Sequence, residues 1–395
     1  MNKELFSRNR VGVAGFDLDT AAYPNVPCRI SQLEAMGISA EDIKRAAAPT
    51  RVGGSFDRGT YYRLRRVLSL TRLALSSFYL AFWILGRGQR LDAVYVSYPG
   101  VFAVWLLSFL PKPVRIPRLF LDSFISWYDT AVIDRASLEF SSLSACLLYA
   151  IERRSFATCE RVFVDTPSNA VHFAKLFRLP SEKIEAVPLA IDEILFTQEL
   201  YRADPARCRV LFIGTFVPLH GVETIFRAAQ LLAEEPGLEI RIIGQGQVAH
   251  GLDALGRGLP RHTTWIRDWK TGPQLAREIS DADVCLGIFG ATTKAQRVWP
   301  FKNYLYMCVG RAIITGATEE ARRLLAASKE LPFLSVPIKD ALALANAIRR
   351  LRLDISLREA LARAGRCCFE ANLSSERSAV QIAAAIKHSW NDEML

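Results

Sequence analysis

Short β-rich runs alternate with longer helical runs along this chain, and this alternation constrains its fold more than any other feature. It is typical of α/β proteins, in which crossover helices join the strands of a parallel sheet. The pattern runs twice, once on each side of a junction near residues 192–205, so the sequence predicts two doubly wound sheets. The expected strands are 11–16, 93–97, 118–121, 161–164 and 186–188 in the first half, and 209–213, 239–243, 284–287 and 312–315 in the second.

The length of 395 residues also favours two domains, because it exceeds what one hydrophobic core usually supports. We expect domains over residues 1–195 and 196–372, with residues 373–395 forming a C-terminal helix that returns to the first domain. Ligands of doubly wound sheets bind beyond the carboxyl ends of the strands, and two such sheets facing each other enclose a cleft. The sequence therefore predicts a binding site in an interdomain cleft.

A formal charge of +10 favours partners that carry negative charge: nucleic acid, anionic lipid or phosphorylated small molecules. No nucleic-acid-binding module is recognisable, so nucleic acid is the least favoured of the three. The eight cysteines show no C-x-x-C spacing and the histidines no metal-ligand spacing, which indicates neither a metal site nor a disulfide scaffold. Residues 1–10 are not followed by a signal-peptide pattern, so we expect a cytoplasmic protein.

Two apolar runs, 73–85 and 101–110, allow two interpretations. Both are shorter than the roughly 20 residues of a membrane-spanning helix, which favours core helices packed on a sheet. However, residues 51–118 hold eleven Lys and Arg against two Asp, and aromatic residues lie among the basic ones. That composition is typical of a surface that lies on an anionic leaflet without crossing it, so peripheral membrane contact stays open.

The segment 209–225 is the strongest local motif, with a strand that ends at Gly214, a short loop, and a helix that opens at Gly221. Glycines let a backbone approach a phosphate closely, and a helix N-terminus offers unpaired N–H groups and a partial positive charge. The segment lacks the G-K-[ST] of a P-loop and the G-x-G-x-x-G of a dinucleotide site. It therefore predicts a phosphate-binding turn of another kind, or an ordinary strand-to-helix turn.

Together with the stretches 239–247, 282–298 and 300–315, this motif resembles family-four glycosyltransferases of the GT-B fold, which use nucleotide-sugar donors. The first half resembles the same family more loosely, in residues 23–29, 121–130, 164–167 and 187–192. The resemblance implies two Rossmann-like domains, the first binding the acceptor and the second a nucleoside-diphosphate sugar. It also implies transfer with retention of anomeric configuration, without a metal ion or a further cofactor.

The chain departs from this family at four positions. Where many members carry two glutamates eight positions apart, it has Arg297 and Leu305, and a leucine cannot accept hydrogen bonds from ribose hydroxyls. Where a basic pair is common in the phosphate loop, it has Thr215 and His220. Other groups must therefore meet the charge of the phosphates.

The resemblance implies roles for residues in both domains. The catalytic candidates are Asp122, which ends a strand of the first domain, and Arg297 and Lys302, which would stabilise the departing diphosphate. The donor-binding candidates are Gly214, Thr215, His220, Gly221, Gly244, Gly290, Thr292, Thr293, Lys294 and Tyr304. The acceptor-side candidates are Tyr23, Asn25 and Arg29, in or just after a loop with two prolines, and Asp165 and Thr166, which end a strand. Helix capping is the alternative role for Asp122, Asp165 and Thr166.

The favoured function is transfer of a sugar from a nucleoside diphosphate to an acceptor hydroxyl of a glycan or lipid-linked glycan, in polysaccharide or cell-envelope synthesis. A lipid-linked acceptor follows if the basic and apolar surface contacts a membrane. Two alternatives stay open. One is a GT-B-like binding or scaffold protein that has lost catalysis, suggested by Leu305 and Thr215. The other is a sugar-nucleotide epimerase on the same architecture.

Overall fold

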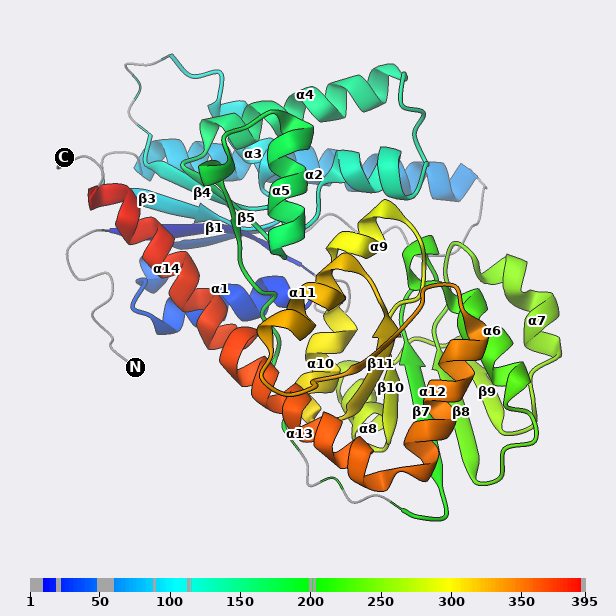
Figure 1. The fold of residues 1–395 in the computed structure, drawn as a ribbon. Coiled ribbons are helices and arrows are strands. Elements are labelled where there is room, and N and C mark those ends of the chain that lie inside the picture. The colour runs from blue at the N-terminus through cyan, green and yellow to red at the C-terminus, as the bar shows by residue number, and fades with distance from the viewer. Residues whose placement is uncertain are drawn as a thin grey trace. The chain divides into compact units, whose positions relative to one another are not determined.

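The computed structural model describes residues 10–18, 23–47, 60–87, 90–111, 114, 116–198, 201 and 204–391. The chain divides into an N-terminal unit, of Met1–Ile191 and Ser374–Leu395, and a C-terminal unit, Asp192–Leu373 (Figure 1). Some residues that carried sequence expectations lie outside the described part of the chain: residues 1–9, Arg51, Arg58, Lys112 and Arg115.

The N-terminal unit is built on a six-stranded parallel sheet in the order β2-β1-β3-β4-β5-β6. Its central strands are continuous apolar runs, as expected when helices cover both faces of a parallel sheet. The strands are β1 Val11–Asp17, β2 Ile43–Ala47, β3 Ala93–Val96, β4 Arg118–Asp122, β5 Arg161–Val164 and β6 Ile184–Ala186. The helices are α1 Asn25–Ala35, α2 Thr60–Arg87, α3 Val101–Leu107, α4 Leu143–Thr158, α5 Pro167–Phe177 and α14 Ser375–Asn391, with short turns η1 Ala40–Asp42, η2 Asp129–Asp134 and η3 Ser181–Lys183.

Three details of this unit differ from the sequence expectations. Strand β2 was not expected, because an edge strand with the sequence Ile-Lys-Arg-Ala-Ala has little apolar character. The strand expected at 186–188 lies at 184–186. Helix α1 begins at Asn25, since prolines are tolerated in the first turn, where backbone N–H groups have no intrahelical acceptor.

The C-terminal helix α14 belongs to the N-terminal unit. It packs against α1, and Arg118 of β4 donates a hydrogen bond to the Ser389 carbonyl oxygen. At its start, Ser375 Oγ accepts from the Ile191 N–H and donates to the Ile191 carbonyl oxygen, both at 2.9 Å. The chain therefore leaves this unit after Ile191 and returns to it at Ser374.

The C-terminal unit has a second six-stranded parallel sheet, in the order β12-β11-β10-β7-β8-β9. The strands are β7 Cys208–Ile213, β8 Leu238–Ile243, β9 Thr263–Ile266, β10 Val284–Leu286, β11 Ala312–Gly316 and β12 Leu334–Val336. The helices are α6 Val222–Leu231, α7 Asp253–Arg257, α8 Gly272–Ser280, α9 Thr293–Arg297, α10 Phe301–Val309, α11 Glu319–Ala327, α12 Ala341–Leu353 and α13 Ile355–Asn372, with turns η4 Pro218–His220 and η5 Ala249–Leu252. Strands β9 and β12, one at each edge, were not expected, because they are short and only partly apolar. Each unit is thus a Rossmann-like doubly wound domain.

Candidate functional site

The glycine turn after β7 lies at the carboxyl end of the central strands of the C-terminal unit. Gly214 directly follows β7 and donates its N–H to the Ile243 carbonyl oxygen of β8 (3.0 Å). Gly221 is the N-cap of α6 and has φ +60°, in the left-handed region that glycine tolerates. A Cβ on Gly221 would overlap the backbone of Phe289 and Gly290. The turn is therefore in close backbone contact with the loop that follows β10.

Hydrogen bonds join these two predicted donor segments, which are far apart in the sequence. Phe289 N donates to His220 O (3.0 Å), and Gly290 N donates to Leu219 O (3.2 Å). Gly244, at the end of β8, has φ +138°, and a Cβ there would overlap the carbonyl oxygen of the residue that follows β7. Three loops can therefore meet at this edge of the sheet only because glycines stand at the contacts.

We expect Gly221→Ala to lower the free energy of unfolding and to weaken binding of a phosphate ligand at the turn. Alanine is strained at φ +60°, at a cost of about 1–3 kcal/mol, and its methyl group would push the Gly290 backbone away. Gly251→Ala is the matched control, because Gly251 lies in the same unit with open space around its Cα. Urea unfolding and calorimetric titration with nucleoside diphosphates measure both effects, and equal behaviour of the two variants would contradict the prediction.

Lys302 lies beside this turn. It is the second residue of α10 and is 6% exposed, and its Nζ is 2.8 Å from where a Cβ on Gly214 would stand. His220 Nδ1 is 3.2 Å from the same point. Lys302 Nζ is also 3.8 Å from the centroid of the Phe212 ring, a cation–π contact. An amine, an imidazole and a glycine backbone therefore converge at the carboxyl end of β7.

Within the part of the chain that the structure describes, no carboxylate pairs with Lys302. Among the described residues, Lys302 Nζ has no hydrogen-bond partner. Burial lowers the pKa of Lys302 well below its ordinary value, because a buried ammonium group loses its hydration. A buried cation in this state is stabilised when an anionic ligand supplies the missing charge and hydrogen-bond acceptors.

The other donor candidates differ in their degree of burial. Lys294 and Arg297 are both buried on α9, and Arg297 Nε donates to the Thr293 carbonyl oxygen (3.1 Å). Thr292 is the N-cap of α9, since its Oγ1 accepts from the Ala295 N–H (3.1 Å). Arg297 is therefore partly engaged by its own helix. Of the remaining candidates, Thr215 and Thr293 are exposed and Tyr304 is buried. Leu305, next to Tyr304, is also buried.

Asn303 is a buried polar residue that the sequence analysis missed. Neither its Oδ1 nor its Nδ2 has a hydrogen-bond partner among the described residues. Its Oδ1 lies 3.1 Å from where a Cβ on Gly287 would stand, next to the Thr315 hydroxyl. In the sequence, only its position next to Lys302 indicates that Asn303 belongs to the site. An amide with unused donors and acceptors at this edge of the sheet can orient a polar ligand or a water molecule.

In the N-terminal unit, Asp122 and Arg29 form one buried ion pair (NH1 to Oδ2, 2.5 Å). Tyr95 Oη donates to the same oxygen (2.6 Å), and Arg29 NH2 donates to the Pro188 carbonyl oxygen (2.5 Å). Burial lowers the pKa of Arg29, but the charge and hydrogen bonds of Asp122 and Tyr95 together outweigh this and raise it. Arg29, which the sequence places in or just after a loop, lies inside α1 and is buried. Because the two residues neutralise each other, this geometry favours a structural role for both.

The remaining acceptor-side candidates lie near the carboxyl ends of the strands. Thr166 is the N-cap of α5 and accepts from the Asn169 N–H (3.1 Å), while Asp165 accepts from Asn169 Nδ2 (2.5 Å). Asn25 is buried at the start of α1. Tyr23 packs against the Tyr98 ring with the ring centroids 5.2 Å apart. Asp165 and Thr166 thus order the start of α5, as the capping alternative describes.

Glu152 of α4 is a second polar group that the sequence analysis missed. Its buried carboxylate accepts from the Ser126 hydroxyl (2.7 Å) and from the N–H groups of Trp127 (2.8 Å) and Tyr128 (3.0 Å). Burial raises the pKa of Glu152 to about 7, although these hydrogen bonds oppose the shift. The carboxylate therefore holds the segment that follows β4 in place, and no local sequence pattern reveals this.

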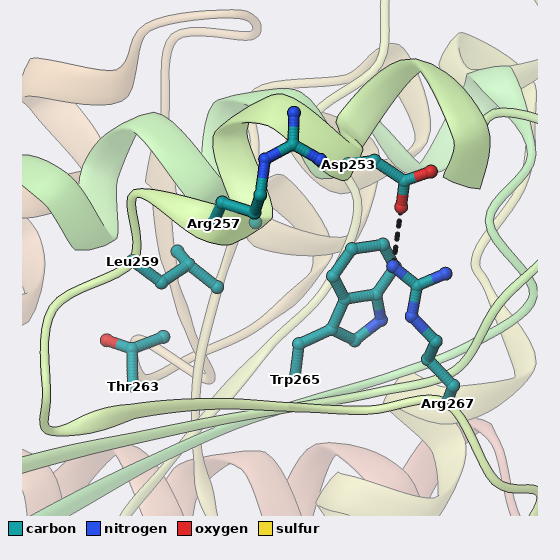
Figure 2. Close-up of a pocket in the computed structure, with 7 residues that line it drawn as sticks. Asp253, Arg257, Leu259, Thr263, Trp265 and Arg267 are labelled. Atoms are coloured by element: carbon teal, nitrogen blue, oxygen red, sulfur yellow. Dashed lines mark hydrogen bonds and ion pairs between the residues drawn. The ribbon is translucent and has the colours of Figure 1, made fainter.

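Two cavities of the C-terminal unit lie apart from Lys302. The larger, about 360 Å³, lies between α7 and β9, where the Arg267 guanidinium stacks on Trp265 (3.8 Å) and pairs with Asp253 (2.5 Å) (Figure 2). Trp265 links this cavity to the glycine turns by donating to the Gly244 carbonyl oxygen (2.9 Å). The smaller, about 310 Å³, lies at the amino ends of the strands. Because the Arg267 cation is already paired and stacked, Lys302 is the better candidate for a phosphate.

Residues 207–354 match the family model described as glycosyl transferases group 1. Similar solved structures include Anabaena HepE in complex with UDP, at 11% sequence identity and a TM-score of 0.65, with 96% of this chain and 100% of HepE covered. Sucrose-phosphate synthase from Thermosynechococcus elongatus is similar at 16% sequence identity and a TM-score of 0.69, with 97% of this chain and 100% of the synthase covered. The fold is GT-B. WaaG, a glycosyltransferase involved in lipopolysaccharide biosynthesis, is similar at 12% sequence identity and a TM-score of 0.61, with 95% of this chain and 99% of WaaG covered. No curated protein sequence matches this chain.

In this GT-B chain, the family match and the site geometry coincide. The matched segment contains the glycine turn after β7, the loop after β10 and Lys302. It does not include the buried Arg29–Asp122 pair of the N-terminal unit. The match to group 1 glycosyl transferases therefore covers the unit in which buried Lys302 lies beside the glycine turn.

Proposed function

We propose that this protein transfers a glycosyl group from a nucleoside-diphosphate sugar to an acceptor hydroxyl. The observation that carries the proposal is the convergence of Lys302, His220 and the Gly214–Gly221 turn inside the segment that matches group 1 glycosyl transferases. The fold likeness to HepE bound to UDP, and to HepE bound to UDP-glucose, supports a nucleotide-sugar donor.

In the proposed reaction, the bond between the anomeric carbon and the β-phosphate oxygen breaks, and the acceptor oxygen bonds to that carbon. The proton of the acceptor hydroxyl passes to the departing diphosphate or to solvent. The main task of the protein is to stabilise the departing diphosphate. Lys302 as an ammonium group and the N–H groups at the start of α6 would share this charge, and we assign a part of it to Arg297 of α9 as well. We propose retention of anomeric configuration and a reaction without a metal ion or a separate cofactor. Within the described residues, no group of three or more His, Cys, Asp or Glu is placed to hold a metal ion.

The acceptor in this proposal is a glycan or a lipid-linked glycan, and the protein works at the cytoplasmic face of a membrane in polysaccharide or cell-envelope synthesis. The likeness to WaaG, which is involved in lipopolysaccharide biosynthesis, supports this direction. The N-terminal unit would bind the acceptor and the C-terminal unit the donor.

We expect Arg297→Ala to lower turnover by about tenfold or more, because one charge-assisted phosphate contact contributes on the order of 1.5–3 kcal/mol. Arg363→Ala is the matched control, since Arg363 lies in the same unit with a side chain that is 69% exposed. Release of nucleoside diphosphate from UDP- and GDP-sugars, with acceptor present, measures turnover. Equal rates for the two variants would remove Arg297 from the site.

The competing function is a nucleotide-sugar-binding protein without catalysis. It is favoured by Leu305, which is buried and offers no hydrogen bond where the resemblance places a ribose-binding glutamate. Calorimetric titration with nucleotide sugars separates the two functions. Binding without product over a broad panel of acceptors would support the non-catalytic protein, and no binding of any nucleotide sugar would contradict both.

A further inference from the structure

One side of helix α2 carries large apolar side chains that face solvent. The most exposed are Phe82 (77%), Leu75 (66%) and Phe78 (60%). Leu68 and Tyr79 are also exposed, and all five recur at the three- and four-residue spacing that places side chains on one side of a helix. These residues, together with Arg72, form the outer face of α2.

The buried side of the same helix carries smaller side chains than this outer face, and two of them are serines. Ser76 and Ser77 are buried, and their hydroxyls donate to the carbonyl oxygens of Ala47 and Leu73, both at 2.7 Å. A helix that only covers a sheet turns its largest apolar side chains inward. Here leucines and serines face inward while both phenylalanines of the helix face outward. A contiguous exposed apolar surface of this kind marks an interaction site.

Positive charge accompanies the outer face. Helix α2 contains five arginines and no Asp or Glu, and Arg72 is exposed within the face. At its border, Lys44 Nζ lies 5.2 Å from the centroid of the Tyr79 ring, whereas the Arg87 guanidinium, further along the helix, is paired with Asp42 (3.2 Å). The charge pattern therefore fits an occupant that is apolar inside and anionic at its surface, which is the chemistry of an anionic leaflet.

Two other arrangements fit the observations less well. Over Leu68–Arg87, α2 is long and apolar enough to cross a bilayer by length and composition, but its inner side packs on β1, β2 and α3. It would have to leave the sheet in order to span. In a symmetric pair of this chain, each copy would present the same arginine-bearing face to the other, which like charges oppose.

We propose that the outer face of α2 docks this protein on an anionic lipid bilayer, with the helix axis in the plane of the leaflet. The apolar side chains enter the boundary between head groups and acyl chains, and the basic ones contact lipid phosphates. This extends the proposed function, because it brings the protein to a lipid-linked acceptor. Docking itself needs no glycosyl transfer, so the two proposals fail separately.

The test is sedimentation of the full chain with vesicles of equal parts phosphatidylcholine and phosphatidylglycerol. We expect binding that weakens strongly between about 0.1 M and about 1 M salt, as the Debye length falls from about 10 Å to about 3 Å. Phe78→Ser/Phe82→Ser is expected to weaken partitioning by at least about tenfold, because both side chains are lost from the bilayer boundary. Arg72→Gln is expected to weaken it by about fivefold.

The control is Leu342→Ser/Leu353→Ser, which removes two exposed leucines from α12 of the C-terminal unit and should leave binding unchanged. Circular dichroism verifies that each variant is folded. The proposal is overturned if the wild type does not bind these vesicles at low salt, or binds vesicles of pure phosphatidylcholine equally well. It is also overturned if bound protein resists extraction by high salt and alkaline carbonate, which indicates a spanning helix. A dimer in solution that the phenylalanine substitutions convert to a monomer, without vesicle binding, would assign the face to a second copy.

Discussion

Lys302→Met is expected to weaken binding of a nucleoside diphosphate by at least about tenfold and to stabilise the free protein. A charge-assisted contact to phosphate contributes about 1.5–3 kcal/mol, and about 1.4 kcal/mol corresponds to a factor of ten. In the free protein, the same amine is buried without a hydrogen-bond partner among the described residues. Methionine of similar length removes this unfavourable burial, so we expect a gain of about 1 kcal/mol or more in the free energy of unfolding.

The pH dependence of both quantities should identify Lys302 as their source. Its pKa is lowered in the folded protein, so the native state binds fewer protons than the unfolded chain between that lowered pKa and about 10.4. The contribution of this residue to the free energy of unfolding therefore rises with pH over that window. A bound diphosphate favours the ammonium form, so affinity for the diphosphate falls as pH rises above the lowered pKa.

Lys302→Met should flatten both pH dependences above pH 7. Titration calorimetry with UDP and GDP, and thermal unfolding over a series of pH values, measure them. His220→Ala is the comparison, because it removes one neighbouring group at the turn but retains the amine. We expect a smaller loss of affinity in that variant and an unchanged slope. Wild-type affinity in Lys302→Met would place the diphosphate elsewhere.

The sequence predicted the architecture because the central strands carry strong local signals. Strand β7 is mostly apolar, ends at Gly214 and lies inside the sheet, and the apolar residues of β8 stand between Gly237 and Gly244. Edge strands carry weaker signals, since one of their sides has no strand to pair with. Strands β2, β9 and β12 each lie at the edge of a sheet, and their short segments mix apolar with polar residues. They are recognised only from their pairing with β1, β8 and β11 in the structure.

The candidate site was predictable only as far as its location. Parallel strands end at the same edge, so residues after β7 and β10 were expected near each other. The contact of Lys302 with Gly214, however, depends on how α10 packs on the sheet. Likewise, Arg29 and Asp122 received separate roles from the sequence, because no local pattern pairs residues on a helix and a distant strand.

Helix α2 shows a different limit of sequence patterns. Apolar residues occur around most of its circumference, so its spacing could not decide which side faces the sheet. The structure decides this through the contacts of β2 and α3 and through the buried serines. The second apolar run is simpler, since Val101, Val104 and Leu107 of α3 are buried as in an ordinary core helix.

Asp122→Ala is expected to lower the free energy of unfolding by about 3–5 kcal/mol, because it leaves a buried guanidinium without its counter-charge. Tyr95 Oη would lose its hydrogen-bond acceptor as well. The double variant Arg29→Met/Asp122→Leu removes both charges and fills the space with apolar atoms. It should therefore be considerably more stable than Asp122→Ala alone. Urea unfolding of Arg29→Met, Asp122→Leu and the double variant gives the coupling free energy.

The same variants test whether Asp122 acts at the reacting sugar, as the family resemblance implies. For a structural pair, loss of turnover should follow loss of stability, and the double variant should regain most of both. For a catalytic carboxylate, the double variant would be well folded and inactive while still binding the donor on the C-terminal unit. The buried Arg29–Asp122–Tyr95 network favours the first outcome, because Asp122 Oδ2 is already occupied by two donors.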